Sequence, residues 1–444
     1  LADEADEQVR RFAELARAMT AIRLRATAAL PLVVVGRVVG VLGLGFLSPR
    51  RLDATEREML AALAEQCAQA LDRARLYRSE LRIADTLQRS LLPQDLPELG
   101  RLALAARYLP GAEGTHAGGD WYDVVELDED RVAIAVGDVV GQGPAAAAVM
   151  GQLRSALSAA LLDGHSPAAA LELLDRFAAR VPGAVASTAA CLVLDRRRGE
   201  IRWARAGHLP PLLLEPDGPA LLESAGSGVV LGAPRRPPYR EGTRTVRPGT
   251  AVLLFTDGIV ERRGEDLDQG LARLASTSAR LAGLPPDELL TRLLAELLGE
   301  AGQPDDVALV LARYLPAPLT EERPARPEGL AGMRRAVRRW VEAVALPEET
   351  AEDLQLALNE ALANSVEHAY AGRPPGTVGY TVAAAPDGSI EVCVQDHGTW
   401  RPAPVDPGSR GRGLTLIRRL ARDVTVDSTP SGGTTVRFRV VPGG

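Results

Sequence analysis

The 444-residue chain contains no lysine, so all 51 of its basic residues are arginines. A phosphate-binding P-loop needs a lysine on the phosphates, and Schiff-base chemistry needs a lysine amine, so both are excluded. No apolar run approaches the roughly 18 residues of a membrane span, because the longest, 31–47, is interrupted by glycines and an arginine. The acidic opening LADEADEQVRR is not a signal peptide, so we expect a cytoplasmic protein without a membrane partner.

Cysteines and basic blocks are also scarce. The three cysteines, Cys67, Cys191 and Cys393, lie far apart among apolar or small residues, which favours buried free thiols over disulfides or a zinc site. The net charge is −7 and no long basic block occurs, which disfavours a nucleic-acid partner.

Four acidic clusters in the middle of the chain each adjoin an apolar, strand-like run. They read GGDWYD (118–123), VAIAVGDVVGQG (132–143), AVLLFTDG (251–258) and QPDDVALVLA (303–312). Short strands that stop at such pairs bring carboxylates to a sheet edge, where several can converge. Converging carboxylates repel one another unless a hard divalent cation lies between them, and Mg²⁺ or Mn²⁺ is the usual occupant.

Asp138 is the best single candidate ligand, followed by Asp257 and the pair Asp305 and Asp306. One such aspartate alone would be an ordinary turn residue, because Asp-Gly pairs are common in turns. Four at strand ends, without a histidine or cysteine ligand motif, indicate instead two oxygen-ligated cations that activate a water for attack on a phosphoryl group. His208, which precedes a proline pair, is expected to be a structural turn residue rather than a general acid.

The segments LQRSLLPQDLP, GGDWYD, GDVVGQGPAAA, AGHLPPLLL, FTDGIVE and QPDDVALVL, in this order, resemble the metal-dependent (PPM) serine/threonine phosphatases of the SpoIIE/RsbU branch. The resemblance covers about 83–314. It implies a β-sandwich flanked by helices, with two Mn²⁺ or Mg²⁺ ions at the sheet edge. The implied substrate is a phosphoserine on an anti-anti-sigma protein of the STAS type, and LQRSLLPQDLP would be the junction through which an upstream sensor helix acts.

The same resemblance implies the metal ligands and the catalytic aspartates. Asp138 would bridge both ions and the backbone carbonyl of Val139 would be a further ligand. Asp257 would also bind metal. Asp120, with Asp123 as a second candidate, would hold metal-bound waters. One of Asp305 and Asp306 would complete the set, and Asp305 is slightly favoured.

A second constellation lies near the end of the chain. LALNEALANSVEHAY places Glu360 and Asn364 four residues apart on one helical face, with His368 a turn further on. By itself this is compatible with an ordinary amphipathic helix. The segments that follow favour a nucleotide site over an ordinary helix. VCVQDHG ends a strand at Asp396, and RGRGL (410–414) is a glycine loop entering a helix, where backbone N–H groups can bind phosphate.

This arrangement, over about 328–441, resembles the GHKL ATP-binding fold of the RsbW/SpoIIAB-like anti-sigma serine kinases. The resemblance implies Glu360 as the catalytic base, Asn364 as the Mg²⁺ ligand of ATP, and Asp396 and Gly398 as adenine contacts. Residues implied to bind phosphate or support the nucleotide are Arg410, Gly411, Arg412, Gly413, Leu414 and Thr434. The open alternative is a C-terminal module that binds a sigma factor or its antagonist without turnover.

The first part of the chain resembles the back half of a GAF sensor domain, with a hairpin turn expected at Gly36-Arg37. The helix expected from Thr55 to Leu92 carries an apolar seam that favours a coiled-coil homodimer, and the alternative is a helix lying on its own domain. The predicted fold is multidomain α+β. Its parts are a GAF remnant (1–54), a signalling helix and switch linker (55–97), a phosphatase domain (98–315), a linker (316–327) and a GHKL α/β sandwich (328–444).

Overall fold

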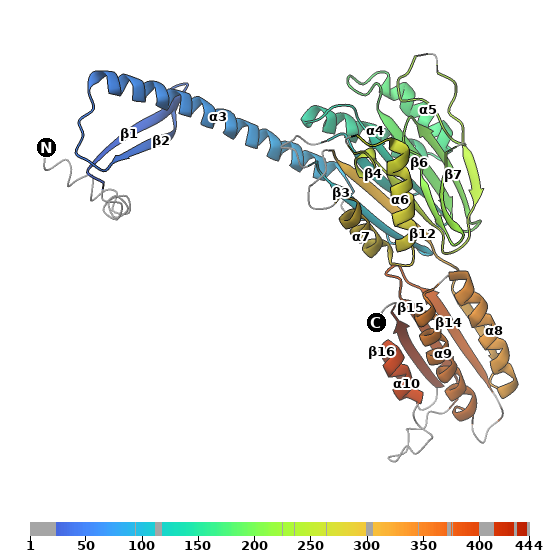
Figure 1. Cartoon of the computed structure of the whole chain (residues 1–444). Coiled ribbons are helices and arrows are strands. Elements are labelled where there is room, and N and C mark those ends of the chain that lie inside the picture. The colour runs from blue at the N-terminus through green and yellow to red at the C-terminus, as the bar shows by residue number, and fades with distance from the viewer. Residues whose placement is uncertain are drawn as a thin grey trace. The chain divides into compact units, whose positions relative to one another are not determined.

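The structure is a computed structural model with two compact units, Leu1–Ile83 and Ala84–Gly444. It describes residues 24–93, 95–111, 118–223, 225–234, 236–262, 264–298, 305–344, 346–370, 374, 376–398, 413–429 and 433–441. The predicted multidomain α+β fold is confirmed by sheets and helices that alternate along the chain (Figure 1).

The first unit contains a hairpin of β1 (Ala26–Val34) and β2 (Arg37–Phe46), followed by helix α3 (Ala54–Leu91). Val34 pairs with Arg37, so the turn residues are Val35 and Gly36, both with positive φ (46° and 74°). The predicted Gly36-Arg37 turn is therefore wrong by one residue. A two-residue hairpin loop of this type needs positive φ at both central positions, and Gly36 satisfies the second of them.

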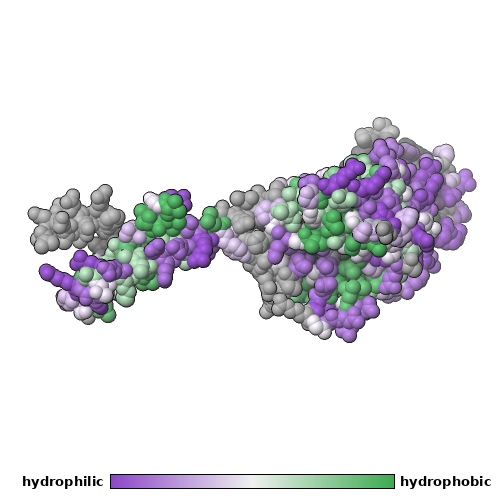
Figure 2. Space-filling model, turned by 90° about the horizontal axis from the view of Figure 1, so that it is seen from above, coloured by the Kyte–Doolittle hydropathy of each residue, from purple (hydrophilic) through white to green (hydrophobic). Residues whose placement is uncertain are grey.

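Helix α3 lies on its own hairpin over its first half. The shared core consists of Leu32, Val39, Ala64 and Ala68, with Cys67 and Leu71 partly buried against it. Further along the same helix Leu76 is 64% exposed. Figure 2 shows such hydrophobic residues exposed among hydrophilic ones on the hairpin and α3. The part of the predicted seam nearest the hairpin is thus occupied within the chain itself.

The second unit begins with a sandwich of two five-stranded antiparallel sheets (Figure 1). One sheet has the order β10 (Gly242–Thr245), β7 (Glu200–Ala206), β6 (Thr188–Asp195), β5 (Arg131–Asp138) and β4 (Trp121–Glu126). The other has the order β3 (Leu102–Leu109), β12 (Val307–Tyr314), β11 (Ala251–Phe255), β8 (Leu212–Glu215) and β9 (Gly218–Leu221). Side chains such as Ile134, Val136 and Val310 fill the space between them.

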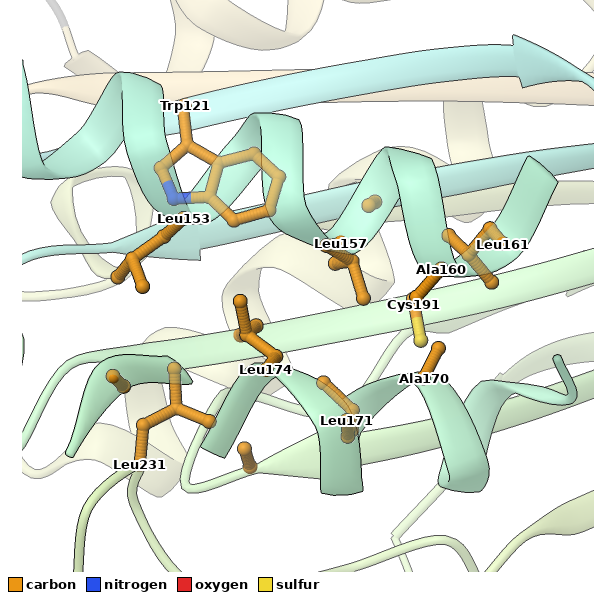
Figure 3. Close-up of a cluster of buried hydrophobic side chains, with 14 of the residues drawn as sticks. Trp121, Leu153, Leu157, Ala160, Leu161, Ala170, Leu171, Leu174, Cys191 and Leu231 are labelled. Atoms are coloured by element: carbon orange, nitrogen blue, oxygen red, sulfur yellow. The ribbon is translucent and has the colours of Figure 1, made fainter. Parts of the chain in front are cut away.

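Helices cover both outer faces of the sandwich. α4 (Pro144–Leu162) and α5 (Pro167–Ala178) pack on the first sheet, and Figure 3 shows Leu153, Leu157 and Leu171 in one buried cluster with Trp121 and Cys191. The second sheet is covered by α6 (Leu267–Leu281) and α7 (Pro286–Leu298), whose leucines pack on β11 and β12. The strands read as continuous apolar runs because both of their faces are buried.

Among the described residues, α4 is the one helix long and apolar enough to cross a membrane by length and composition. Nine of its residues are buried, and Met150, Leu153 and Leu157 lie in the core against the first sheet. A core helix of a sandwich passes the same test, so we interpret α4 as one. The end of α3 rests on it, because a Cβ at Gly151 would lie 2.9 Å from the Leu91 side chain.

The C-terminal part is a five-stranded antiparallel sheet, with helices packed on it by one shared core (Figure 1). Its strand order is β13 (Leu319–Pro324), β14 (Thr377–Ala384), β15 (Ile390–Asp396), β17 (Gly433–Val440) and β16 (Arg422–Thr429). The helices are α8 (Pro327–Val344), α9 (Glu348–His368) and α10 (Gly413–Leu420).

The predicted linker 316–327 is wrong in its central part, because Leu319–Pro324 forms the edge strand β13 paired with β14. Prolines flanking and ending this strand hid it in the sequence. An edge strand tolerates a proline at its end, since one side of the strand needs no ladder hydrogen bond.

Candidate metal centre and nucleotide site

Three aspartates from separate segments meet at one edge of the sandwich. Asp120 directly precedes β4, Asp138 ends β5, and Asp257 opens the short 3₁₀ helix η1 (Asp257–Ile259) that follows β11. Each contributes a carboxylate oxygen, and these oxygens all lie within 4.8 Å of one another. β5 and β11 belong to different sheets, so the stacking of the sheets creates this group.

Burial, together with repulsion from nearby carboxylates, raises the pKa of all three carboxyl groups. Burial, followed by the charge of Asp138, raises the pKa of Asp120 well above its usual range. Burial also raises the pKa of Asp138, with a further contribution from Asp305. The pKa of Asp257 rises to about 7, first through burial and then through repulsion by Asp138. A bound divalent cation would oppose this repulsion and favour the ionised carboxylates.

One oxygen of the group has no protein partner. Asp120 is 3% exposed, and its Oδ2 makes no hydrogen bond. The hydroxyl of Thr256 hydrogen-bonds the same carboxylate and lowers its pKa, while Thr256 Oγ1 accepts a hydrogen bond from the Ala308 amide at 2.8 Å. A buried acceptor without a donor is costly. The residues present therefore fit a hard divalent cation, which takes oxygen ligands.

The backbone around the group is closely packed. The Val139 amide donates to Gly119 O at 3.2 Å, and a Cβ at Gly119 would lie 2.0 Å from the carbonyl oxygen of Val139. Only glycine allows this approach. The carbonyl implied as a ligand by the resemblance thus lies directly beside the segment that carries Asp120.

Asp305 and Asp306 differ in their surroundings, and neither belongs to the group of three among the described residues. Asp305 is exposed, and its Oδ1 accepts the Asp306 amide at 2.8 Å. Asp306 is 5% exposed; its Oδ2 accepts a hydrogen bond from the Tyr108 hydroxyl, and its Oδ1 accepts one from the Gly111 amide. Both carboxylates are near enough to raise the pKa of Asp138.

Asp123 does not join the group. Its Oδ2 accepts a hydrogen bond from Ser158 and lies 3.2 Å from Nη1 of Arg154, both on α4. The alternation of side chains along β4 puts Asp123 on the same face as the buried Trp121. The pattern GGDWYD could not distinguish these two aspartates, because both are acidic and adjoin one strand.

The nucleotide constellation comes together around α9. Glu360 and Asn364 lie under the first residue of α10: a Cβ at Gly413 would be 2.2 Å from Glu360 Oε1 and 2.8 Å from Asn364 Nδ2. Gly398 is equally confined, because a Cβ there would lie 2.1 Å from the carbonyl oxygen of Ala369. Leu414 is partly buried against the core of this domain.

Asp396, at the end of β15, is 3% exposed. Its carboxylate accepts hydrogen bonds from Ser365 Oγ at 3.0 Å, the Gly398 amide at 3.0 Å and the Thr434 amide at 3.3 Å. A carboxylate offers about four acceptor sites, so one remains for an amino group. Sequence reasoning missed Ser365, although it directly follows Asn364. The predicted Arg410, Gly411 and Arg412 lie outside the described residues.

Comparisons with known proteins match three segments of the chain in order. The GAF domain model matches residues 3–72, the Stage II sporulation protein E (SpoIIE) model residues 128–315, and the histidine kinase-like ATPase domain model residues 323–440. The serine-protein kinase RsbW of Listeria monocytogenes serovar 1/2a is 32% identical over 123 residues, which are 24% of this chain and 76% of that protein. The chain belongs to the family that joins a SpoIIE/RsbU-type phosphatase to an RsbW-type ATPase domain.

Two further similar proteins include the phosphatase region of this chain. Phosphoserine phosphatase RsbU of Bacillus subtilis (strain 168) is 27% identical over 190 residues, which cover 43% of this chain and 56% of RsbU. The chain thus spans about half the length of this relative. The crystal structure of the RsbU and RsbW domains of Rv1364c from Mycobacterium tuberculosis is 33% identical, with a TM-score of 0.48, and covers 79% of this chain and 96% of that one.

Proposed function

We propose that this chain is a metal-dependent protein serine phosphatase acting on a phosphorylated anti-anti-sigma protein of the STAS type. The observation that carries the proposal is the meeting of Asp120, Asp138 and Asp257 within 4.8 Å, with Asp120 Oδ2 left without a partner. Phosphoserine cleavage is what RsbU is named for. The partner's identity as a STAS protein rests on the family resemblance.

Asp120, Asp138 and Asp257 would hold the Mn²⁺ or Mg²⁺ ions, and Asp305 would be an additional ligand. Bound divalent cations supply a water of lowered pKa and polarise the phosphoryl oxygens. The chain's own contribution is to hold Asp120 buried, to keep Asp138 at the end of a rigid strand, and to place Asp257 opposite from the second sheet.

The test is hydrolysis of a phosphoserine peptide and of a phosphorylated STAS protein with and without Mn²⁺. Asp138→Asn and Asp257→Asn should each lower turnover by about 100-fold or more, because they remove a ligand rather than an outer contact. The matched control is Asp128→Asn, which changes an exposed aspartate paired with Arg131 in the β4–β5 turn. Unchanged turnover in either site variant, with metal bound, would contradict the proposal.

The geometry of the C-terminal domain supports a second activity, phosphorylation, which opposes that of the phosphatase domain. Glu360 and Asn364 form a cradle so close beneath Gly413 that a Cβ there would clash with both side chains. We propose that this cradle holds ATP with Mg²⁺ and that Glu360 accepts the proton of a serine hydroxyl. Phosphorylation of the STAS partner by wild type but not by Glu360→Gln, with nucleotide binding equal in both, would support a kinase. Partner binding without any phosphorylation would support the alternative of a non-catalytic anti-sigma module.

A homodimer through α3, a sigma factor as a further partner and a cytoplasmic location complete the proposal. Exposed apolar residues beyond the hairpin, such as Leu76, support a helix partner for α3. Sedimentation of wild type and Leu76→Glu tests the dimer, which should be weakened in the variant.

A further inference from the structure

The half-buried Tyr108 and the buried Asp306 form a hydrogen-bonded pair next to the three-carboxylate group. Tyr108 lies on β3 and its hydroxyl donates to Asp306 Oδ2, directly before β12. β3 and β12 are neighbours in the sheet, with Tyr108 opposite Ala308. Asp306 is 5% exposed, so its carboxylate oxygens take their hydrogen bonds from within the protein.

The same carboxylate holds both ends of the connection that leads to Asp120. Its Oδ1 accepts the Gly111 amide at 2.8 Å. At the other end, a Cβ on Gly118 would lie 1.5 Å from Asp306 Oδ2. Gly118 therefore packs directly on the carboxylate, two residues before Asp120, and a side chain at this position would displace one of them.

Asp306 also fixes the segment that carries Asp257. A Cβ on Gly258 would lie 2.1 Å from the carbonyl oxygen of Asp306. One residue thus contacts Gly118, two residues before Asp120, and Gly258, directly after Asp257, as well as Gly111. Its two carboxylate oxygens already accept hydrogen bonds from Tyr108 and Gly111, whereas Asp305 is exposed at the rim.

We propose that Tyr108 and Asp306 are positioning residues that anchor the backbone on both sides of the cation site. The inference rests on the proposed cation site. Tyr108 acts through Asp306: its hydroxyl holds the carboxylate toward Gly111 and Gly118. Asp120 is thereby kept where its oxygen can meet those of Asp138 and Asp257. Outer-sphere contacts of this kind typically change metal affinity by about 10–100-fold.

The test is a double-mutant cycle on Mn²⁺ affinity, measured by calorimetric titration of the metal-free full chain. Tyr108→Phe removes only the hydroxyl, and Asp306→Asn keeps the size of the side chain. Each should weaken Mn²⁺ binding by about tenfold without changing the number of ions bound. The double variant should bind Mn²⁺ as tightly as the single variant with the lower affinity, because the two residues act as one unit.

The matched control is Tyr314→Phe, which removes another buried tyrosine hydroxyl from the same sheet, one that donates to Arg196 O at 2.8 Å. It should lower thermal stability without changing Mn²⁺ affinity. Amide hydrogen exchange of the metal-free proteins gives a second readout: exchange at Gly118 to Trp121 should speed up in Tyr108→Phe and stay unchanged in Tyr314→Phe.

The possible outcomes test the anchoring role of Tyr108 and Asp306, called the anchor below, separately from the proposed function. Wild-type Mn²⁺ affinity in Tyr108→Phe, additive effects in the double variant, or loss of one bound ion in Asp306→Asn but not in Asp305→Asn would each overturn the anchor while leaving the cation site in place. A wild-type chain that binds no Mn²⁺ would overturn the proposed function, and the anchor's role with it.

Discussion

The imidazole of His208 donates a hydrogen bond from Nε2 to the backbone carbonyl oxygen of Phe255, over 3.1 Å. A carbonyl only accepts, so Nδ1 carries no proton and accepts the hydroxyl of Thr188 at 2.7 Å. Thr188 begins β6 and Phe255 ends β11, which lie in different sheets. His208 therefore joins the two layers of the sandwich as a structural residue with both ring nitrogens engaged, and its partner Phe255 lies two residues before Asp257.

The buried His208, hydrogen-bonded to both sheets, predicts that the protein loses stability in mild acid. Burial lowers the pKa of His208 to about 4, so below about pH 6.5 the unfolded chain binds a proton that the folded chain does not. The free energy of unfolding should fall by about 3 kcal/mol between pH 6.5 and pH 4. Hydrogen exchange of the β6 and β11 amides measures it. His208→Gln, which cannot charge, should show a correspondingly smaller decline; the same decline in both proteins would contradict the assignment.

The acidic group predicts the opposite trend for the metal-free chain. The pKa of Asp257 is raised to about 7, so the folded chain retains a proton that the unfolded chain releases near pH 4. Stability is therefore lost as the pH rises from about 4 through 7. Relative to wild type, metal-free Asp257→Asn should gain stability as the pH increases over this range. Thermal unfolding in the presence of a chelator, and again with Mn²⁺, checks this: Mn²⁺ should reverse the order of the two proteins at pH 8.

In the proposed nucleotide site, Gly413→Ala should weaken binding of a non-hydrolysable ATP analogue with Mg²⁺ by about tenfold or more. The added Cβ would lie 2.2 Å from Glu360 Oε1 and 2.8 Å from Asn364 Nδ2, so both side chains would have to move. Gly379→Ala in β14 is the control, because the nearest atom to its Cβ would be 3.9 Å away. Equal nucleotide affinity in the two variants, measured by titration, would show that the cradle is not the nucleotide site.

The core beneath α4 predicts a difference between two leucines of one helix. Leu157 is fully buried against the first sheet (Figure 3), whereas Leu162 is 58% exposed. Leu157→Ala should cost about 2–5 kcal/mol of stability, because it leaves a cavity. Leu162→Ala should cost less than about 1 kcal/mol. Denaturant unfolding followed by hydrogen exchange of α4 distinguishes them. Similar costs would mean that α4 is not the core helix described here.

Periodic segments were predictable from sequence. The helix expected at Thr55 to Leu92 differs from α3 by one residue at each end. Sequence prediction failed for segments whose structure depends on a neighbouring strand. The strand Leu319–Pro324 was missed because its prolines indicate a linker unless the neighbouring edge position is known.

The site divides in the same way. Acidic residues at the ends of apolar runs indicated Asp120, Asp138 and Asp257, since a strand end places its carboxylate at a sheet edge whatever the sheet order. Sequence could not choose between Asp305 and Asp306, because adjacent residues differ only in the direction in which they point. Tyr108, Thr256 and Ser365 gave no signal at all, because a hydroxyl acquires its role only from the acceptor that folding brings to it.

The sequence by itself determined which chemical groups the chain possesses and which strand ends carry them: carboxylates without lysine, and glycines at the helix and loop entries. The tertiary structure alone decided which of those groups meet. Asp138 ends β5 and Asp257 follows β11, which belong to different sheets, so the separation of the two carboxylates depends on the packing of the side chains between the layers. That packing is a collective property of many buried residues, so no local pattern encodes it.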